Sequence, residues 1–242
     1  MTHPRMAHKR ILLKLSGEIL IGPQKFGIDY DACLAVAHSL KKIQDNQHEL
    51  AVVIGGGNIF RGIRLKETGL ARTPSDHVGM LATLMNGIVL QQALNAVGCA
   101  SQVMSAIECP QMASSYRWHD ATTQLSAGKV LIFVGGTGNP YFTTDTAAAL
   151  RASEIQADIL LKATKVDGIY NKDPIKNPDA MKYSKLSYSQ ILAEKLEVMD
   201  STSIALCRNN HIPILVFNMK LLECGEINIV SLIEKGTYVE GN

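Results

Sequence analysis

Four apolar, strand-like runs of this 242-residue chain end in turns that carry glycine or lysine. The runs are ILLKLSG at 11–17, VVIGGGN at 52–58, LIFVGGTGN at 131–139 and ILLKATKVDG at 159–168. Glycine turns let backbone N–H groups approach an anion closely, because no Cβ is in the way and positive φ is accessible. Lysines at two of these turns add positive charge. The pattern predicts one phosphate-handling site, and the alternative for any single cluster is a plain strand-to-helix turn.

Phosphoryl transfer is the chemistry that suits these residue types. The chain lacks a G-x-x-x-x-G-K-[ST] P-loop, a complete G-x-G-x-x-G fingerprint, the H-R-D and D-F-G pair of protein kinases, a G-x-S-x-G elbow and an H-E-x-x-H zinc spacing. Lysines, glycines and carboxylates remain. They suit a transfer in which positioning and charge neutralisation dominate. Asp145, at the start of an expected helix, could orient the lysines or a Mg²⁺ ion carried by the nucleotide, and the alternative is that it only caps the helix.

The candidate residues at these turns have structural alternatives. Lys14 could be a surface lysine, but its place inside an apolar run favours a functional role. Lys162 and Lys165 could simply flank a turn, and Asp200 could cap the helix that follows it. Tyr170 stands between the turn signals DG and NKDP, which favours a partly exposed lid over a core position.

Composition excludes several classes of protein. Hydrophobic residues make up 46% of the chain and charged residues 19%, which is typical of a globular protein with a sizeable core. A net charge of +2 and an aromatic content of 5% give no reason to expect nucleic acid as a partner. Five scattered cysteines without a C-x-x-C pair favour a reducing, cytoplasmic location. The sequence has no uninterrupted run of 18 apolar residues, so we expect no membrane span.

Strand and helix patterns alternate along the chain. This alternation predicts an α/β fold, a three-layer αβα sandwich with a mainly parallel central sheet, whose ligands bind beyond the carboxyl ends of the strands. Without repeats or linkers, we expect a single domain over 1–242, with 1–8 as a flexible N-terminal extension. The expected strands are 9–15, 50–54, 101–105, 129–134, 158–161 and 214–217, and the expected helices are 31–43, 75–97, 144–157, 187–195 and 201–209, with short irregular or helical pieces at 110–128.

The expected helix at 75–97 is unusually apolar. It begins with a serine and an aspartate, which are preferred cap residues. Because its apolar positions nearly encircle the helix, it must be buried on most sides, either in the core or against a second copy of the chain.

Six ordered motifs carry a resemblance to a known family: KLSGE at 14–18, GGGNIFRG at 55–62, DHVGMLAT at 76–83, GGTGNPYFTTDTAAALRA at 135–152, LLKATKVDGIYNKDP at 160–174 and VMD at 198–200. From about Lys9 to its end, the chain resembles the bacterial uridylate (UMP) kinases of the amino acid kinase superfamily. The resemblance implies ATP-dependent phosphorylation of UMP to UDP in pyrimidine nucleotide biosynthesis, on a single αβα domain. It also implies a homohexamer, activation by GTP and inhibition by UTP.

The motifs also allow individual site residues to be predicted. We predict catalytic roles for Lys14, Asp145, Lys162, Lys165 and Asp200. The resemblance implies an ATP site made of Lys14, Leu15, Ser16, Gly17, Gly57, Arg61, Thr164, Tyr170 and Asp173. It implies a UMP site made of Gly56, Asp76, Thr137, Gly138, Asn139, Pro140, Tyr141, Phe142, Thr143 and Thr144. A carboxylate such as that of Asp76 suits a ribose diol, and a guanidinium such as that of Arg61 suits phosphate.

Other hypotheses stay open beside this one. Members of the superfamily also phosphorylate carboxylates or carbamate, and others are nucleotide-bound storage or regulatory assemblies. The GTGNPYFTTD loop and Asp76 favour a nucleotide acceptor, although spacing alone does not separate UMP from CMP. Lys25 replaces a glycine that the family usually has before Phe26, in a segment linked to GTP activation, so activation of this chain needs direct measurement.

Overall fold

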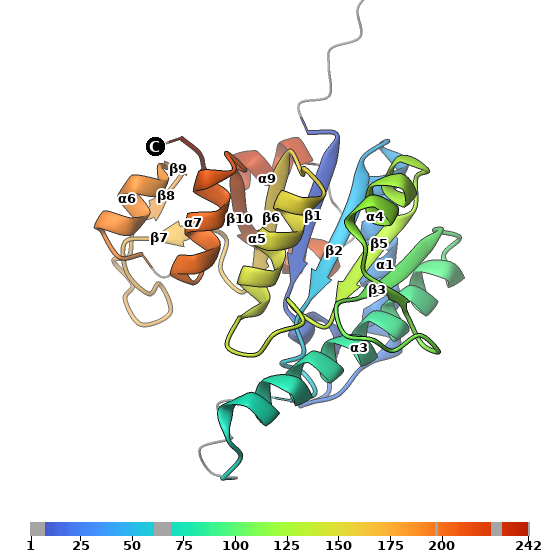
Figure 1. The fold of residues 1–242 in the computed structure, drawn as a ribbon. Helices are drawn as coiled ribbons and strands as arrows, with labels where there is room; N and C mark the ends of the chain where they lie inside the picture. Colours follow the sequence, from blue (N-terminus) through green and yellow to red (C-terminus); the bar gives the residue numbers. More distant parts are fainter. Residues whose placement is uncertain (1–7, 61–68, 197, 224–228, 242) are drawn as a thin grey trace, which may run out of the picture.

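The strands that end in the four glycine and lysine turns lie side by side in one sheet (Figure 1). They are β1 (Arg10–Leu15), β2 (Glu49–Ile54), β5 (Val130–Val134) and β6 (Ile159–Thr164). The computed structural model describes residues 8–60, 69–196, 198–223 and 229–241. In these ranges, further strands of the sheet are β3 (Ser101–Ser105), β4 (Ser114–Ser115), β9 (Lys185–Leu186), β10 (Ile214–Asn218) and β11 (Thr237–Val239).

The strand order is β4-β3-β5-β2-β1-β6-β10-β11-β9. Each paired neighbour is parallel except β10 with β11, which run antiparallel. A separate antiparallel pair, β7 (Ile169–Tyr170) and β8 (Lys182–Tyr183), forms a hairpin beside the sheet. The predicted mainly parallel α/β fold is therefore confirmed.

Two helical layers cover the sheet, because successive strand residues point to opposite faces. Leu12 packs in one buried cluster, whereas Ile11 and Leu13 pack in the other. The first cluster includes residues of α4 (Trp118–Ser126), α5 (Thr144–Glu154), α6 (Tyr188–Ala193) and α7 (Ser201–Asn209). The second includes residues of α1 (Tyr30–Asp45), α3 (Arg72–Ala96), α8 (Lys220–Glu223) and α9 (Ile229–Lys235), and the short 3-10 helix η1 (Gly17–Leu20) packs there too.

Most expected elements are confirmed with shifted ends. The strand expected at 158–161 continues to Thr164, and the helix expected at 144–157 ends at Glu154. The expectation that α3 begins at a serine and aspartate cap is wrong. The helix starts at Arg72, and Pro74 is tolerated in its first turn because the N–H that proline lacks has no helical partner there. Ser75 Oγ instead donates a hydrogen bond to the carbonyl oxygen of Ala71.

α3 presents different chemistry on its two sides. Its inner side packs closely on β5, since a Cβ added to Gly87 would collide with the side chain of Val134. Its outer side exposes a stripe of large apolar residues: Val78, Leu81, Met85 and Ile88. Within the four described ranges, none of the helices combines the length and hydropathy that a membrane span requires.

Candidate active site

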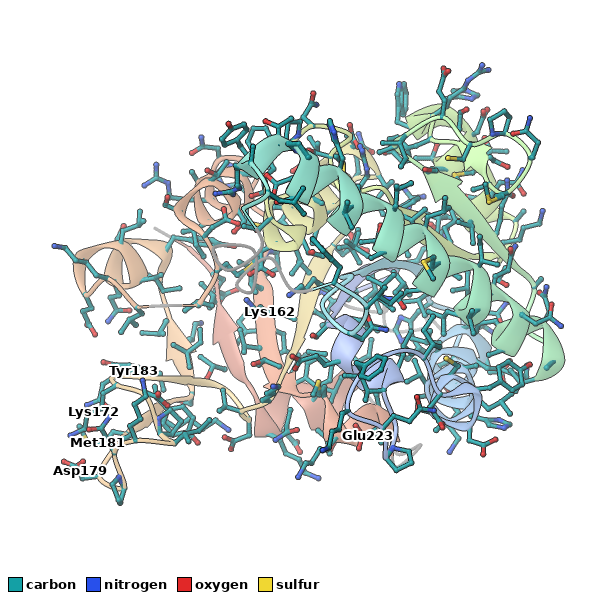
Figure 2. All side chains as sticks on the ribbon, turned by 90° about the horizontal axis from the view of Figure 1, so that it is seen from below. Lys162, Lys172, Asp179, Met181, Tyr183 and Glu223 are labelled. Carbon is teal, nitrogen blue, oxygen red and sulfur yellow. The ribbon has the colours of Figure 1, made fainter. Side chains whose placement is uncertain are left out.

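The carboxyl ends of β5, β2, β1 and β6 form one continuous edge. These strands are parallel neighbours, so the turns that follow them must lie along the same side of the sheet. Figure 2 looks onto this edge and shows Lys162 near its middle. The prediction that the four turns meet along one edge is confirmed.

Lys14 and Lys162 are direct register partners on β1 and β6. Both therefore point to the same face of the sheet, the one that α5 covers. Their side chains are only 14% and 12% exposed. Two ammonium groups this close together and this well buried need a countercharge.

Asp145 supplies that countercharge from the first turn of α5. Lys14 Nζ lies 2.8 Å from Asp145 Oδ1, and Lys162 Nζ lies 2.7 Å from Oδ2. The alternative that Asp145 only caps its helix is wrong, because Thr143 is the N-cap and its Oγ1 accepts hydrogen bonds from the backbone N–H groups of Asp145 and Thr146. The carboxylate is thereby left to the two lysines.

Burial and charge act in opposite directions on this cluster. Burial alone would raise the pKa of Asp145, but the ammonium groups of Lys14 and Lys162 together hold that pKa below its ordinary value. Burial lowers the pKa of Lys162, and the like charge of Lys14 adds to this, against the attraction of Asp145. The three residues thus form one buried charged cluster, in which the carboxylate of Asp145 opposes the lowering of the pKa of Lys162.

A short segment before α7 holds this cluster in place. The carbonyl oxygen of Val198 accepts a hydrogen bond from Lys162 Nζ. Asp200 caps α7 by accepting from the backbone N–H of Ser203, as its structural alternative predicted. Its other carboxylate oxygen accepts from the hydroxyl groups of Thr143 and Thr146. Asp200 therefore fastens the N-terminus of α5, where Asp145 lies.

One cavity, of about 480 Å³, opens beside Lys162. Four of the predicted site residues contribute to its lining: Lys162, Thr164, Tyr170 and Asp173. Figure 2 shows Lys172, Asp179 and Met181 on the hairpin that projects from this side of the molecule. Tyr170 is partly exposed and donates a hydrogen bond from its hydroxyl group to Asp167, as expected of a residue outside the core.

A second cavity, of about 260 Å³, lies between the glycine turns and the N-terminal half of α3. Its lining includes these predicted residues: Gly56, Gly57, Asp76, Thr137, Asn139, Phe142, Thr143 and Thr144. Gly57, which the resemblance assigns to ATP, therefore lies on this second side.

Asp76 holds the loop that closes the second cavity. Its Oδ2 accepts hydrogen bonds from the backbone N–H of Tyr141, at 2.7 Å, and from Arg72 Nε, at 2.9 Å. Tyr141 has φ of +72°, which is strained for a bulky residue, and the Arg72 guanidinium lies 5.3 Å from its ring centroid. Gly138, Pro140 and Tyr141 belong to this loop without lining the cavity.

The remaining predicted residues lie around the end of β1, except Arg61, which is outside the described residues. The side chain of Leu15 is fully buried, so only its backbone could reach a ligand. Ser16 caps η1 at the end of the strand, directly before Gly17. Lys165 is 62% exposed and pairs with Glu18 Oε2 at 2.6 Å, so the structure does not bring it to Asp145. Arg61 lies outside the described residues.

Sequence reasoning missed two buried polar residues of α3 that hold the glycine turns. Thr83 Oγ1 accepts a hydrogen bond from the backbone N–H of Gly135 at 2.8 Å. Asn86 Nδ2 donates to the carbonyl oxygen of Gly55 at 2.7 Å. The available signal was polarity inside a nearly apolar helix, because a buried polar side chain needs a partner.

The sequence model of the amino acid kinase family matches residues 9–218. The chain belongs to the amino acid kinase family. Among curated members, it is 67% identical to a protein named uridylate kinase from Protochlamydia amoebophila (strain UWE25), over 96% of this chain and 93% of that protein. It is 50% identical to a uridylate kinase from Aeromonas salmonicida (strain A449), over 90% and 89% of the two chains.

Solved structures named UMP kinase share the fold. The UMP kinase from Ureaplasma parvum superposes with a TM-score of 0.89 at 38% identity, covering 96% of this chain and 99% of that one. The UMP kinase from Bacillus anthracis gives a TM-score of 0.88 at 33% identity, covering 96% of each chain.

Proposed function

We propose that the protein transfers the γ-phosphoryl group of ATP to UMP, giving ADP and UDP, as a step of pyrimidine nucleotide synthesis. The observation that carries this proposal is the pair of cavities beside one charged cluster. Lys162 lines the first cavity, and Thr144, which directly precedes Asp145, lines the second. The printed names of relatives at 67% and 50% identity support UMP as the acceptor.

ATP is assigned to the larger cavity and UMP to the smaller. Thr164, Tyr170 and Asp173 would surround the adenine and ribose of ATP. Asp76 would accept hydrogen bonds from the ribose hydroxyls of UMP, because a carboxylate offers acceptor sites beyond the two that Tyr141 and Arg72 use. In this arrangement the γ-phosphate of ATP and the phosphate of UMP would meet near Lys14 and Lys162.

The cluster would act by electrostatics rather than by proton transfer. A phosphate monoester has a second pKa of about 6, so the acceptor is already largely ionised at neutral pH and needs no general base. Lys14 and Lys162 would neutralise charge on the transferring group, while Asp145 keeps both lysines oriented. Each well-placed donor is worth about 3–4 kcal/mol of transition-state stabilisation. The role predicted for Lys165 stays a prediction.

A kinase that uses ATP generally requires a divalent metal ion, and we propose Mg²⁺. The described residues contain no group of three His, Cys, Asp or Glu that could form a dedicated metal site. The carboxylates of Asp145 and Asp200 are engaged by lysines and by hydroxyl groups. This arrangement fits Mg²⁺, which is commonly coordinated by nucleotide phosphates and several waters, with few protein ligands. When bound, the ion would neutralise charge on the phosphate oxygens.

The proposed assembly is a homohexamer, regulated by GTP and UTP, in the cytoplasm. The exposed apolar stripe of α3 supports contact with another copy of the chain. The free thiols of Cys33, Cys99, Cys109 and Cys207 support a reducing compartment. Light scattering tests the hexamer, and a monomer mass at micromolar protein would refute it. Rates at low UMP with and without GTP or UTP test the regulation.

A coupled ADP-release assay tests the reaction itself. UMP, CMP, glutamate and buffer alone are compared at fixed ATP and Mg²⁺. We expect ADP release that depends on UMP. Release with glutamate instead would favour the alternative carboxylate kinase, and release with none of the acceptors would favour a nucleotide-binding assembly without turnover.

A further inference from the structure

Asn58 and Asn86 form a reciprocal pair of buried side-chain amides outside the two cavities. Asn58 Nδ2 donates to Asn86 Oδ1 at 2.8 Å, and Asn86 Nδ2 donates to Asn58 Oδ1 at 2.8 Å. The residues are 2% and 0% exposed. Asn58 follows the glycine turn after β2, and Asn86 lies on the inner side of α3.

The second hydrogen of each amide is used on a backbone carbonyl. Asn58 Nδ2 donates to Gly27 O at 2.9 Å, and Asn86 Nδ2 donates to Gly55 O at 2.7 Å. Because a carbonyl can only accept, these two bonds fix which end of each side chain is nitrogen. All four amide hydrogens and both side-chain oxygens are thus engaged. A fully satisfied buried network of this kind rigidifies what it connects.

The pair hydrogen-bonds to the turn after β2 and packs closely against Gly17 in the turn after β1, beside the proposed phosphate-transfer position. Gly55 donates from its backbone N–H to Leu15 O at 3.0 Å, which ties the glycine turn to the end of β1. A Cβ on Gly17 would collide with Asn58 Oδ1 and with Gly55 O, so the two turns are in direct contact. Next to them, Gly56 lines the smaller cavity.

We propose that Asn58 and Asn86 are positioning residues for phosphoryl transfer, which hold the turn after β2 against the turn after β1. This inference rests on the proposed function for its kinetic part. The pair touches neither cavity, so it acts through the backbone of the turns rather than on a substrate. Its loss should leave both substrates bound but poorly aligned.

The test uses Asn86→Ala, Asn58→Ala and the double variant in the full-length chain. The matched control is Ser39→Ala, because Ser39 is also fully buried and its hydroxyl donates to Leu222 O, between α1 and α8. Two readouts are taken for every protein. One is hydrogen exchange at the backbone amides of residues 55–60, and the other is kcat with the KM values for ATP and UMP.

We expect faster exchange at residues 55–60 in the asparagine variants but not in Ser39→Ala. We expect kcat to fall roughly 10²-fold, the usual penalty for a misplacement of about 1 Å, with both KM values nearly unchanged. The double variant should be about as slow as each single variant, because the two residues act as one unit.

Unchanged exchange at residues 55–60, or faster exchange with normal kcat, would overturn the proposal. So would a change confined to KM, which would indicate a binding role. If Asn86→Ala does not fold, Asn58→Ala breaks the same pair from the loop side, and failure of both to fold would make the pair a folding determinant instead. Absence of UMP turnover in the wild-type protein would refute the proposed function, while the exchange readout would still test the pair.

Discussion

Replacement of Asp145 by asparagine tests the charged cluster most directly. The change keeps the shape of the side chain but removes a negative charge that lies 2.8 Å and 2.7 Å from two ammonium groups. Removing one partner of a buried ion pair costs about 3–5 kcal/mol of stability. At ~2–4 °C per kcal/mol for a chain of this size, the melting temperature should fall by about 6–20 °C.

The same variant should lose activity and change its pH dependence. We expect kcat to fall at least ~10²–10³-fold, as when a single preorganised donor is lost, because both lysines are affected. The pKa of Lys162 is already below the ordinary lysine value of 10.5, and Asp145 is the main group that raises it. Without that carboxylate the pKa must fall further, so activity that requires the ammonium should be lost at lower pH on the alkaline side.

Steady-state ADP release between pH 6 and pH 10, together with thermal melts, measures both effects. Glu49→Gln is the matched control, since Glu49 is a buried carboxylate that pairs with Lys9 and Arg10 at the opposite end of β1 and β2. It should lower stability and leave kcat unchanged. A value of kcat for Asp145→Asn close to that of the wild type, or an unmoved alkaline limb, would refute the reasoning.

Three other predictions follow from the site and from α3. Lys14→Ala should lower turnover by orders of magnitude and leave the circular dichroism spectrum nearly unchanged, because Asp145 keeps Lys162 as a partner; near-normal turnover would contradict the role of Lys14. Asp76→Asn should raise the KM for UMP about tenfold, equivalent to ~1.4 kcal/mol of binding, with little change in kcat in steady-state assays. Met85→Glu places a charge in the exposed stripe and should reduce the mass measured by light scattering, whereas an unchanged mass would exclude that stripe as a contact.

Sequence reasoning worked best where a residue type conflicted with its surroundings. Lys14 interrupts an apolar strand, and burying a charge is costly without a partner, so a site was the reasonable interpretation. The structure adds that Lys162 is its register partner and that Asp145 joins them. Strand order is set by contacts between distant segments, so no local pattern could show that β1 and β6 are neighbours.

Other features could not be predicted, because the local sequence pattern was too short or did not show the distant contact that decides the structure. Ser75 and Asp76 have the composition of a helix cap, but the carboxylate of Asp76 is used by the distant backbone of Tyr141, and the helix begins earlier. The antiparallel strand β11 is three residues long, too short for an alternating pattern to stand out. Asn58 and Asn86 are 28 positions apart, and only the fold makes them a pair.

The two outermost strands of the sheet, in the part of the chain that the structure describes, are two residues long. Ser114 and Ser115 are exposed on one border, and on the other the ammonium group of Lys185 pairs with Glu240. Short, polar borders leave few free backbone groups as a template for a strand from another chain. Growth by strand addition along these two borders, which underlies many aggregates, is therefore disfavoured.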